Sequence, residues 1–195
     1  MIGRIEQAKR FFNTVRTEVI NTGNQIHITL VYFQKEKDFE MFNEVKAAFE
    51  ALKADSVLMG NGIEGSLLTP SGQFSRGRGL QIGADSRPAD SLLFMVDIDM
   101  VFKADLLIKI AENTRPQQAY MPIVFSQYEF RDDQTDNSVI TTTQGFWRSY
   151  GFGMISIYKR DLKASGGYNM NIEGWGMEDV ELCDALIKER LTKHY

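Results

Sequence analysis

The chain has 195 residues, of which 43% are hydrophobic and 25% are charged, proportions that fit one ordinary globular domain. The formal net charge of −4 argues against nucleic acid as a partner, because binding to phosphate backbones usually needs a basic face. The single cysteine, Cys183, cannot form a disulfide within the chain, so cysteine usage does not identify a cellular compartment.

The first half of the chain alternates helical and extended patterns. Apolar residues at helical spacing predict a helix over residues 5–19, and β-branched and aromatic residues at 26–33 predict a buried strand. A second amphipathic helix is expected over 38–52, with a short strand at 57–59. A glycine-rich segment follows at 72–79.

The second half continues the alternation. The expected strands are 91–96, 119–125, 139–143 and 152–158, the expected helices are 103–113 and 177–191, and the polar segment 129–138 is expected to be a loop. Strands that alternate with helices predict an α/β fold with a mainly parallel central sheet flanked by helices. In such sheets, ligands bind beyond the carboxyl ends of the strands.

Two carboxylates follow directly after the predicted strand 91–96. Asp97 and Asp99 are two residues apart, so on an extended chain their side chains point the same way. Adjacent like charges are costly unless a cation holds them together, and hard oxygen ligands suit Mg²⁺ or Mn²⁺ bridging a diphosphate. A competing interpretation is an acidic pair that only caps the next helix, but the apolar strand before it favours a site.

A second motif, Gly-Trp-Gly-Met-Glu-Asp, occupies residues 174–179. Its glycines permit a sharp turn, and Trp175 offers a flat apolar face for a sugar ring. Glu178 and Asp179 begin the predicted helix, where acids are also favoured by the helix dipole alone. An inverting glycosyl transfer needs a base for the acceptor hydroxyl and a Lewis acid on the leaving diphosphate, and the two motifs supply one of each.

The two motifs occur together with three further segments. These are 74–77 (Phe-Ser-Arg-Gly), 125–128 (Phe-Ser-Gln-Tyr) and 145–153 (Gly-Phe-Trp-Arg-Ser-Tyr-Gly-Phe-Gly). In this order, the five segments resemble the chondroitin N-acetylgalactosaminyltransferase and chondroitin synthase family over about residues 26–191. More distantly, the chain is similar to the β1,4-galactosyltransferases.

The resemblance implies a GT-A-like nucleotide-sugar-binding fold, a UDP-sugar donor and Mn²⁺ or another divalent cation. In this comparison Asp99 matches the metal-binding acid, and Asp97 matches its partner nearer the nucleotide. Arg76 matches a basic residue that faces the donor diphosphate. Gly151 matches a position that lines the donor-sugar pocket, where a missing side chain leaves room for the acetamido group of GalNAc; relief of backbone strain is the competing interpretation.

The resemblance matches Asp179 to the catalytic base and Glu178 to an acceptor-side position. It matches Trp175 to a sugar-side position among the residues that bind the donor. Family members also carry a histidine-bearing segment after the last helix, which supplies a further metal ligand. His194 does not match that segment and is expected to be an ordinary surface residue, while His27 lies in a predicted strand and is expected to be structural.

The implied activity is inverting transfer of GalNAc from UDP-GalNAc to a glucuronate-ended chondroitin-type acceptor. Alternatives are a non-catalytic helper of a partner transferase subunit, an inactive fragment, or a relative that transfers galactose or glucose. We expect residues 1–195 to form a single domain that is part of a longer polypeptide. The resemblance also implies a Golgi lumenal location, with a membrane anchor elsewhere in the full-length protein.

Overall fold

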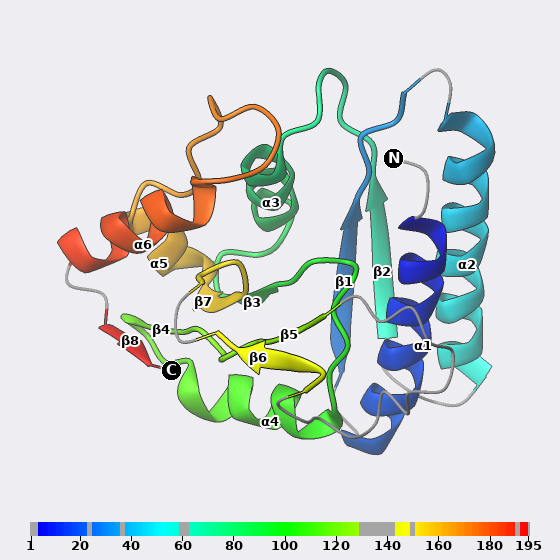
Figure 1. Cartoon of the computed structure of the whole chain (residues 1–195), viewed down its shortest axis with the longest axis horizontal. Helices are drawn as coiled ribbons and strands as arrows, with labels where there is room; N and C mark the ends of the chain where they lie inside the picture. The colour runs from blue at the N-terminus through cyan, green and yellow to red at the C-terminus, as the bar shows by residue number, and fades with distance from the viewer. Residues whose placement is uncertain are drawn as a thin grey trace.

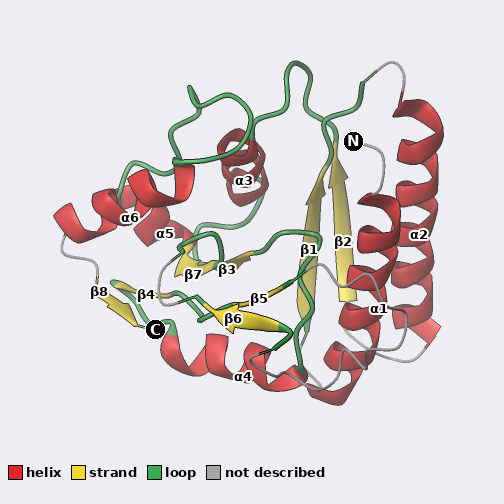
Figure 2. Cartoon of the chain, in the orientation of Figure 1, coloured by secondary structure: helices red, strands yellow, loops and turns green. Residues whose placement is uncertain are grey.

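The computed structural model describes residues 4–22, 25–35, 38–58, 63–128, 143–148, 151–189 and 192–194. Within these residues, helices pack around two regions of β-sheet (Figure 1 and Figure 2). One region holds two strands beside two long helices, and the other holds a four-stranded sheet with shorter helices. None of the described helices is long and apolar enough to cross a membrane.

The first region consists of helices α1 (Arg4–Thr22) and α2 (Phe39–Leu58) and strands β1 (Ile26–Val31) and β2 (Ile63–Leu68). The strands pair in parallel, and the two helices lie side by side next to them (Figure 1). The helical period of the sequence explains the packing, because one face of α1 is 7% exposed or less; it comprises Ala8, Phe11, Phe12, Val15 and Val19. This face meets Phe49 and Leu52 of α2 in one hydrophobic core.

The second region contains the remaining elements. They are α3 (Arg76–Asp85), β3 (Leu92–Met95), α4 (Ala104–Asn113), β4 (Gln118–Tyr120), β5 (Phe125–Gln127), β6 (Gly145–Trp147), β7 (Ile155–Tyr158), α5 (Lys159–Ala164), α6 (Glu178–Lys188) and β8 (Thr192–His194). Four strands form one sheet in the order β3-β7-β4-β8, and β5 and β6 form an antiparallel pair. Its core includes Ile155, Ile157 and Leu186, each 1% exposed or less.

The α/β class is confirmed, but strand directions are more mixed than predicted. Strands β3, β4 and β8 run the same way, whereas β7 lies between β3 and β4 and is antiparallel to both. Three of the four strands therefore run in the same direction, but two of the three strand pairs are antiparallel. An antiparallel neighbour needs no crossover helix, which is consistent with the position of β7 in the sheet.

Several predicted elements differ from the structure. The strand expected at 57–59 is wrong for residues 57 and 58, because α2 continues through Leu58. The glycine-rich segment 72–79, for which the sequence predicts no helix, contains the first turn of α3. Strand β2 and helix α5 were not predicted. The expected loop at 129–138 lies outside the described residues, as does nearly all of the strand expected at 139–143.

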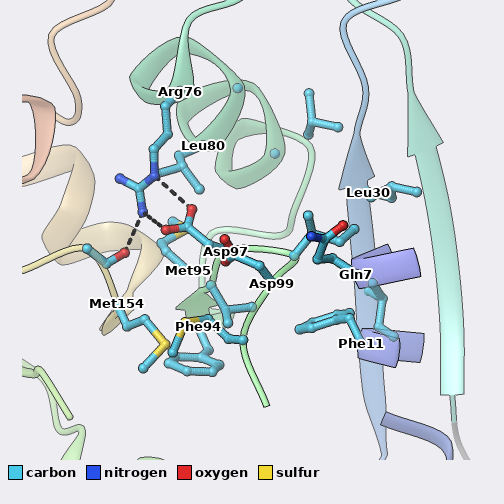
Figure 3. A pocket seen from close by; sticks show the side chains of 18 of the residues that line it. Gln7, Phe11, Leu30, Arg76, Leu80, Phe94, Met95, Asp97, Asp99 and Met154 are labelled. Carbon is cyan, nitrogen blue, oxygen red and sulfur yellow. Dashed lines mark hydrogen bonds and ion pairs between the residues drawn. The ribbon is translucent and has the colours of Figure 1, made fainter. Parts of the chain in front are cut away.

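A groove of about 2010 Å³ lies between the two regions. Strand β1 lines one side, and β3 with the turn that follows it lines the other (Figure 3). The acidic residues of both sequence motifs also line this groove: Asp97, Asp99, Glu178 and Asp179. The fold therefore brings together segments that are about 80 positions apart in the sequence.

Candidate active site

The acidic pair after β3 is divided between two environments. The chain turns at Asp97–Asp99 and does not continue extended, and the amide of Met100 donates to the Asp97 carbonyl at 3.2 Å. A turn therefore replaces the extended backbone that the sequence predicts for this pair. Asp97 has a side chain that is 36% exposed and turns toward α3, while Asp99 is exposed at the groove (Figure 3).

Arg76, the first residue of α3, is held by the carboxylate of Asp97. Its Nε donates to Asp97 Oδ1 at 2.8 Å and its Nη2 donates to Asp97 Oδ2 at 3.2 Å, a two-point ion pair. The Nη2 group also donates to the carbonyl of Gly153 at 2.6 Å (Figure 3). Burial lowers the pKa of Arg76, but the hydrogen bonds and charge of its acidic partners outweigh burial, so the net pKa is raised and the guanidinium stays charged.

Glu178, at the start of α6, is the second acidic partner of Arg76. Its Oε1 accepts from Arg76 Nη1 at 3.0 Å, and its Oε2 accepts from the amide of Gly176 at 2.6 Å. The residue is 1% exposed. Glu178 is therefore an internal partner of Arg76 in this structure, and the acceptor-side position that the resemblance implies stays a prediction.

The loop before α6 has an unusual backbone. Gly174, Gly176 and Met177 have φ values of 78°, 117° and 69°, all in the left-handed region that favours glycine. This conformation explains why glycines flank Trp175, which is 74% exposed and lines the groove. Met177 is the one of these three residues that is not glycine, and such strain clusters at functional sites.

Asp179 is the second residue of α6 and lines the groove. Its Oδ1 accepts from the amide of Val180 at 2.9 Å. Its Oδ2 lies 3.8 Å from where a Cβ on Gly153 would be, so the carboxylate lies close to the segment before β7. Asp179 is less buried than Glu178, and this position suits a base that must reach a bound hydroxyl.

Gly151 has a φ of +123°, so a side chain there would be strained whatever space surrounds it. A Cβ at this position would approach Arg148 Cδ at 3.6 Å, an ordinary contact distance. The backbone therefore explains this glycine without reference to a donor sugar. The proposed link between Gly151 and donor choice stays a prediction.

The residues at this site fit a divalent cation that also binds phosphate. Within the described residues, the Asp99 carboxylate makes no hydrogen bond or ion pair, and no group of three or more His, Cys, Asp or Glu side chains could hold a metal. One free carboxylate matches ions such as Mg²⁺, which one or two carboxylates and the substrate phosphates bind together. Asp97 can add a ligand only through lone pairs that Arg76 leaves free.

Sequence reasoning missed several residues that build the site. Ser75 caps α3, since its hydroxyl accepts from the amide of Arg78 at 3.2 Å, and a serine before a helix is a known start signal. Gly77 lets α3 approach α6, because a Cβ there would lie 3.1 Å from Glu178 Cβ. No local signal identifies Gly77, because its neighbour is about 100 positions away.

His27 lines the same groove but makes its side-chain contacts with residues of β2. His27 lies in β1, where its Nε2 and Ser66 Oγ are 2.8 Å apart, so the structural role that we expected is confirmed. The backbone of His194 is part of β8, which pairs in parallel with β4. The surface position expected for His194 lies outside what the structure describes.

An α/β fold in which an acidic turn after a strand and a helix that starts with two acids line one groove is consistent with a glycosyltransferase of the GT-A type. Comparison with known proteins gives the particular family. Residues 1–193 match the family model described as "Chondroitin N-acetylgalactosaminyltransferase". The chain therefore belongs to this glycosyltransferase family.

Individual relatives support the same family. The chain is 30% identical to mouse (Mus musculus) chondroitin sulfate synthase 3 over 96% of its length and 33% identical to human (Homo sapiens) chondroitin sulfate N-acetylgalactosaminyltransferase 1 over 92%. It spans 21% of the first relative and 34% of the second. No solved structure matches the chain.

Proposed function

We propose that this chain forms the catalytic core of an inverting transferase that moves GalNAc from UDP-GalNAc to a glucuronate-ended chondroitin-type acceptor. The observation that carries the proposal is the convergence of Asp97, Asp99, Glu178 and Asp179 on one groove, from two motifs about 80 positions apart. Family membership and the names of the relatives support the choice of sugar and acceptor.

The chemistry assigns different tasks to the acids. Asp179 takes the proton of the acceptor hydroxyl while that oxygen bonds to the anomeric carbon from the face opposite the diphosphate. The bond between the anomeric carbon and the diphosphate oxygen breaks, and its electron pair leaves with UDP. Asp99, assisted by Asp97, would hold a divalent cation, which would supply Lewis-acid stabilisation of the leaving diphosphate.

Trp175 completes the proposed site. It lies beside Glu178 and Asp179 in sequence and exposes most of its indole to the groove. A flat exposed aromatic ring can stack on the apolar face of a sugar. We therefore assign Trp175 to sugar binding in the groove. Location in the Golgi lumen and action beside a partner transferase subunit belong to the same proposal and rest on the family resemblance alone.

Titration calorimetry of the chain with UDP, with and without Mn²⁺, tests the metal-dependent donor site. We expect Mn²⁺ to be required for tight binding, and Asp99→Asn to weaken UDP affinity in Mn²⁺ by about tenfold or more, the usual scale for a perturbed metal site. Asp90→Asn is the control, because Asp90 is exposed and does not line the groove. Equal UDP affinity with and without Mn²⁺ contradicts the proposal.

A further inference from the structure

The guanidinium of Arg76 has almost no capacity left for a substrate. An arginine side chain has five N–H donors. Four of these donors already make hydrogen bonds: two to Asp97, one to Glu178 and one to the carbonyl of Gly153. The residue is 7% exposed. An arginine that binds a diphosphate through two or more hydrogen bonds needs more unused N–H groups than Arg76 has.

The partners of Arg76 lie on three different segments of the chain. Asp97 follows β3, Gly153 precedes β7 and Glu178 begins α6. No hydrogen bond joins Asp97 directly to Glu178 among these residues. The relative position of the two carboxylates therefore depends on the group between them.

The backbone around Arg76 fixes it in place. The Arg76 amide donates to the Gly174 carbonyl at 2.8 Å, and the Gly174 amide donates to the Phe74 carbonyl at 3.0 Å. The Ser75 hydroxyl donates to the Ile172 carbonyl at 2.6 Å. The start of α3 is thus joined to the loop that carries Trp175 and leads into Glu178.

We propose that Arg76 is a positioning residue and does not bind the UDP-sugar donor directly. It holds the carboxylate of Asp97, on the donor side, in register with Glu178, on the acceptor side, and with the loop of Trp175. This inference rests on the proposed function, because that function defines which side of the groove binds the donor and which side binds the acceptor. Its geometry is independent of that function, because each contact is internal to the protein.

Lysine cannot replace this arrangement. An ammonium keeps the positive charge but is a point donor without the planar fork that contacts two carboxylates at once. We expect Arg76→Lys to lower kcat for GalNAc transfer about 100-fold, the effect typical of misplacing a catalytic group by about 1 Å. Arg78→Lys is the matched control, since Arg78 lies on the same helix but donates to Ser71 and contacts no acid of the site.

Donor binding separates positioning from direct contact. If Arg76 acts through Asp97, UDP affinity in the double variant Arg76→Lys/Asp97→Asn should lie within about twofold of that in Asp97→Asn. If Arg76 binds the diphosphate itself, the two losses multiply, and the inference is overturned. An unchanged kcat in a folded Arg76→Lys variant also overturns it.

A second measurement decides the matter if Arg76→Lys does not fold. Asp97→Asn, Glu178→Gln and their combination are compared by urea unfolding of the chain. We expect the effect of the double variant on the unfolding constant to depart from the product of the two single effects by about threefold or more, because one guanidinium serves both carboxylates. Fully multiplicative effects would show that Arg76 does not couple them.

The outcomes also distinguish this inference from the proposed function. A wild-type chain that binds no UDP and transfers no sugar refutes the function but leaves the unfolding comparison informative. Conversely, wild-type transfer with independent effects of Asp97→Asn and Glu178→Gln supports the function and rejects the role of Arg76.

Discussion

Tyr168 is the titratable residue most affected by its surroundings near the active site. It is 4% exposed and packs in the core beneath Arg76. Burial raises the pKa of its hydroxyl well above the ordinary value of 10.0, because the phenolate would lose its hydration. The folded protein therefore keeps a proton that the unfolded chain releases above about pH 10.

This difference predicts a specific loss of stability in alkali. Above about pH 10 the folded state binds one more proton than the unfolded state, so the free energy of unfolding falls by up to about 1.4 kcal/mol per pH unit from this group. Below about pH 10 both states are protonated and the effect vanishes. Urea unfolding of wild type and Tyr168→Phe between pH 8 and about pH 11 measures it. The two proteins should lose stability at different rates only above about pH 10, and parallel curves throughout would contradict the prediction.

At the residue scale, the sequence predicts which acids gather but not what they contact. The position of Asp97 and Asp99 after an apolar strand and of Glu178 and Asp179 at a helix start suffices to place them at one ligand-binding edge. The pairing of Arg76 with Glu178 could not be predicted, because the two residues are 102 positions apart. From the sequence alone, an arginine that binds a diphosphate could equally have paired with either acidic motif. Only the fold shows that its donors are already used.

At the scale of single elements, α3 depends on tertiary contacts more than the other helices do. It contains Gly77, Gly79 and Gly83 within ten residues, and glycine disfavours a helix by about 1 kcal/mol each. Two of these glycines are close to neighbouring elements: a Cβ on Gly77 would lie 3.1 Å from Glu178 Cβ, and one on Gly79 would lie 3.1 Å from Phe33. The glycines therefore lower the intrinsic stability of α3 but allow it to pack closely against its neighbours at the site.

Alanine substitutions along α3 test this view. Gly77→Ala should destabilise the protein by about 1–3 kcal/mol, because the new methyl group overpacks against the buried start of α6. Gly83→Ala is the control on the same helix; its Cβ would meet Val31 at an ordinary 3.4 Å, so it should stabilise the protein by about 0.5–1 kcal/mol through helix propensity. Urea unfolding measures both. A Gly77→Ala protein as stable as Gly83→Ala would show that α3 and α6 can move apart without cost.

The elements that sequence predicts best are those with the longest local pattern. Helices α1, α2, α4 and α6 all appear near their predicted positions, because a repeating apolar face identifies a helix without knowledge of its partner. Helix α3 could not be predicted in the same way, since its glycines oppose a helix locally. The strand predicted at 57–59 overlaps the end of α2, which continues through Leu58.

At the scale of the whole molecule, two hydrophobic cores flank the groove. One lies under α1, α2, β1 and β2, and the other lies under the four-stranded sheet with α5 and α6. Residues after β3, including Val96 and Ile98, pack against the first core, while Leu93 and Met95 within β3 belong to the second. The turn that carries Asp97 and Asp99 thus connects the two cores at the groove.

The sequence predicts the α/β class of this architecture but not the division into separate sheets. Within the described residues, β1 pairs with β2 and β3 pairs with β7, and no pairing joins the two sheets. Alternating strands and helices cannot reveal this arrangement, because the hydrophobic pattern of a strand does not identify its neighbour. The reversed direction of β7 was missed for the same reason.

The central claim, that the acids around the groove perform sugar transfer, is tested most directly by Asp179→Asn. The substitution removes the proposed base with little change in volume, in a polypeptide that transfers GalNAc from UDP-GalNAc to a glucuronate-ended acceptor. Glu181→Gln is the control, because Glu181 lies two residues further along α6 and is exposed. A base contributes about 10²–10⁴-fold and acts in the transition state more than in the ground state. We predict that kcat falls at least about 100-fold while UDP affinity stays within about threefold. Retention of more than about a tenth of wild-type turnover would contradict the assignment of Asp179 as the base.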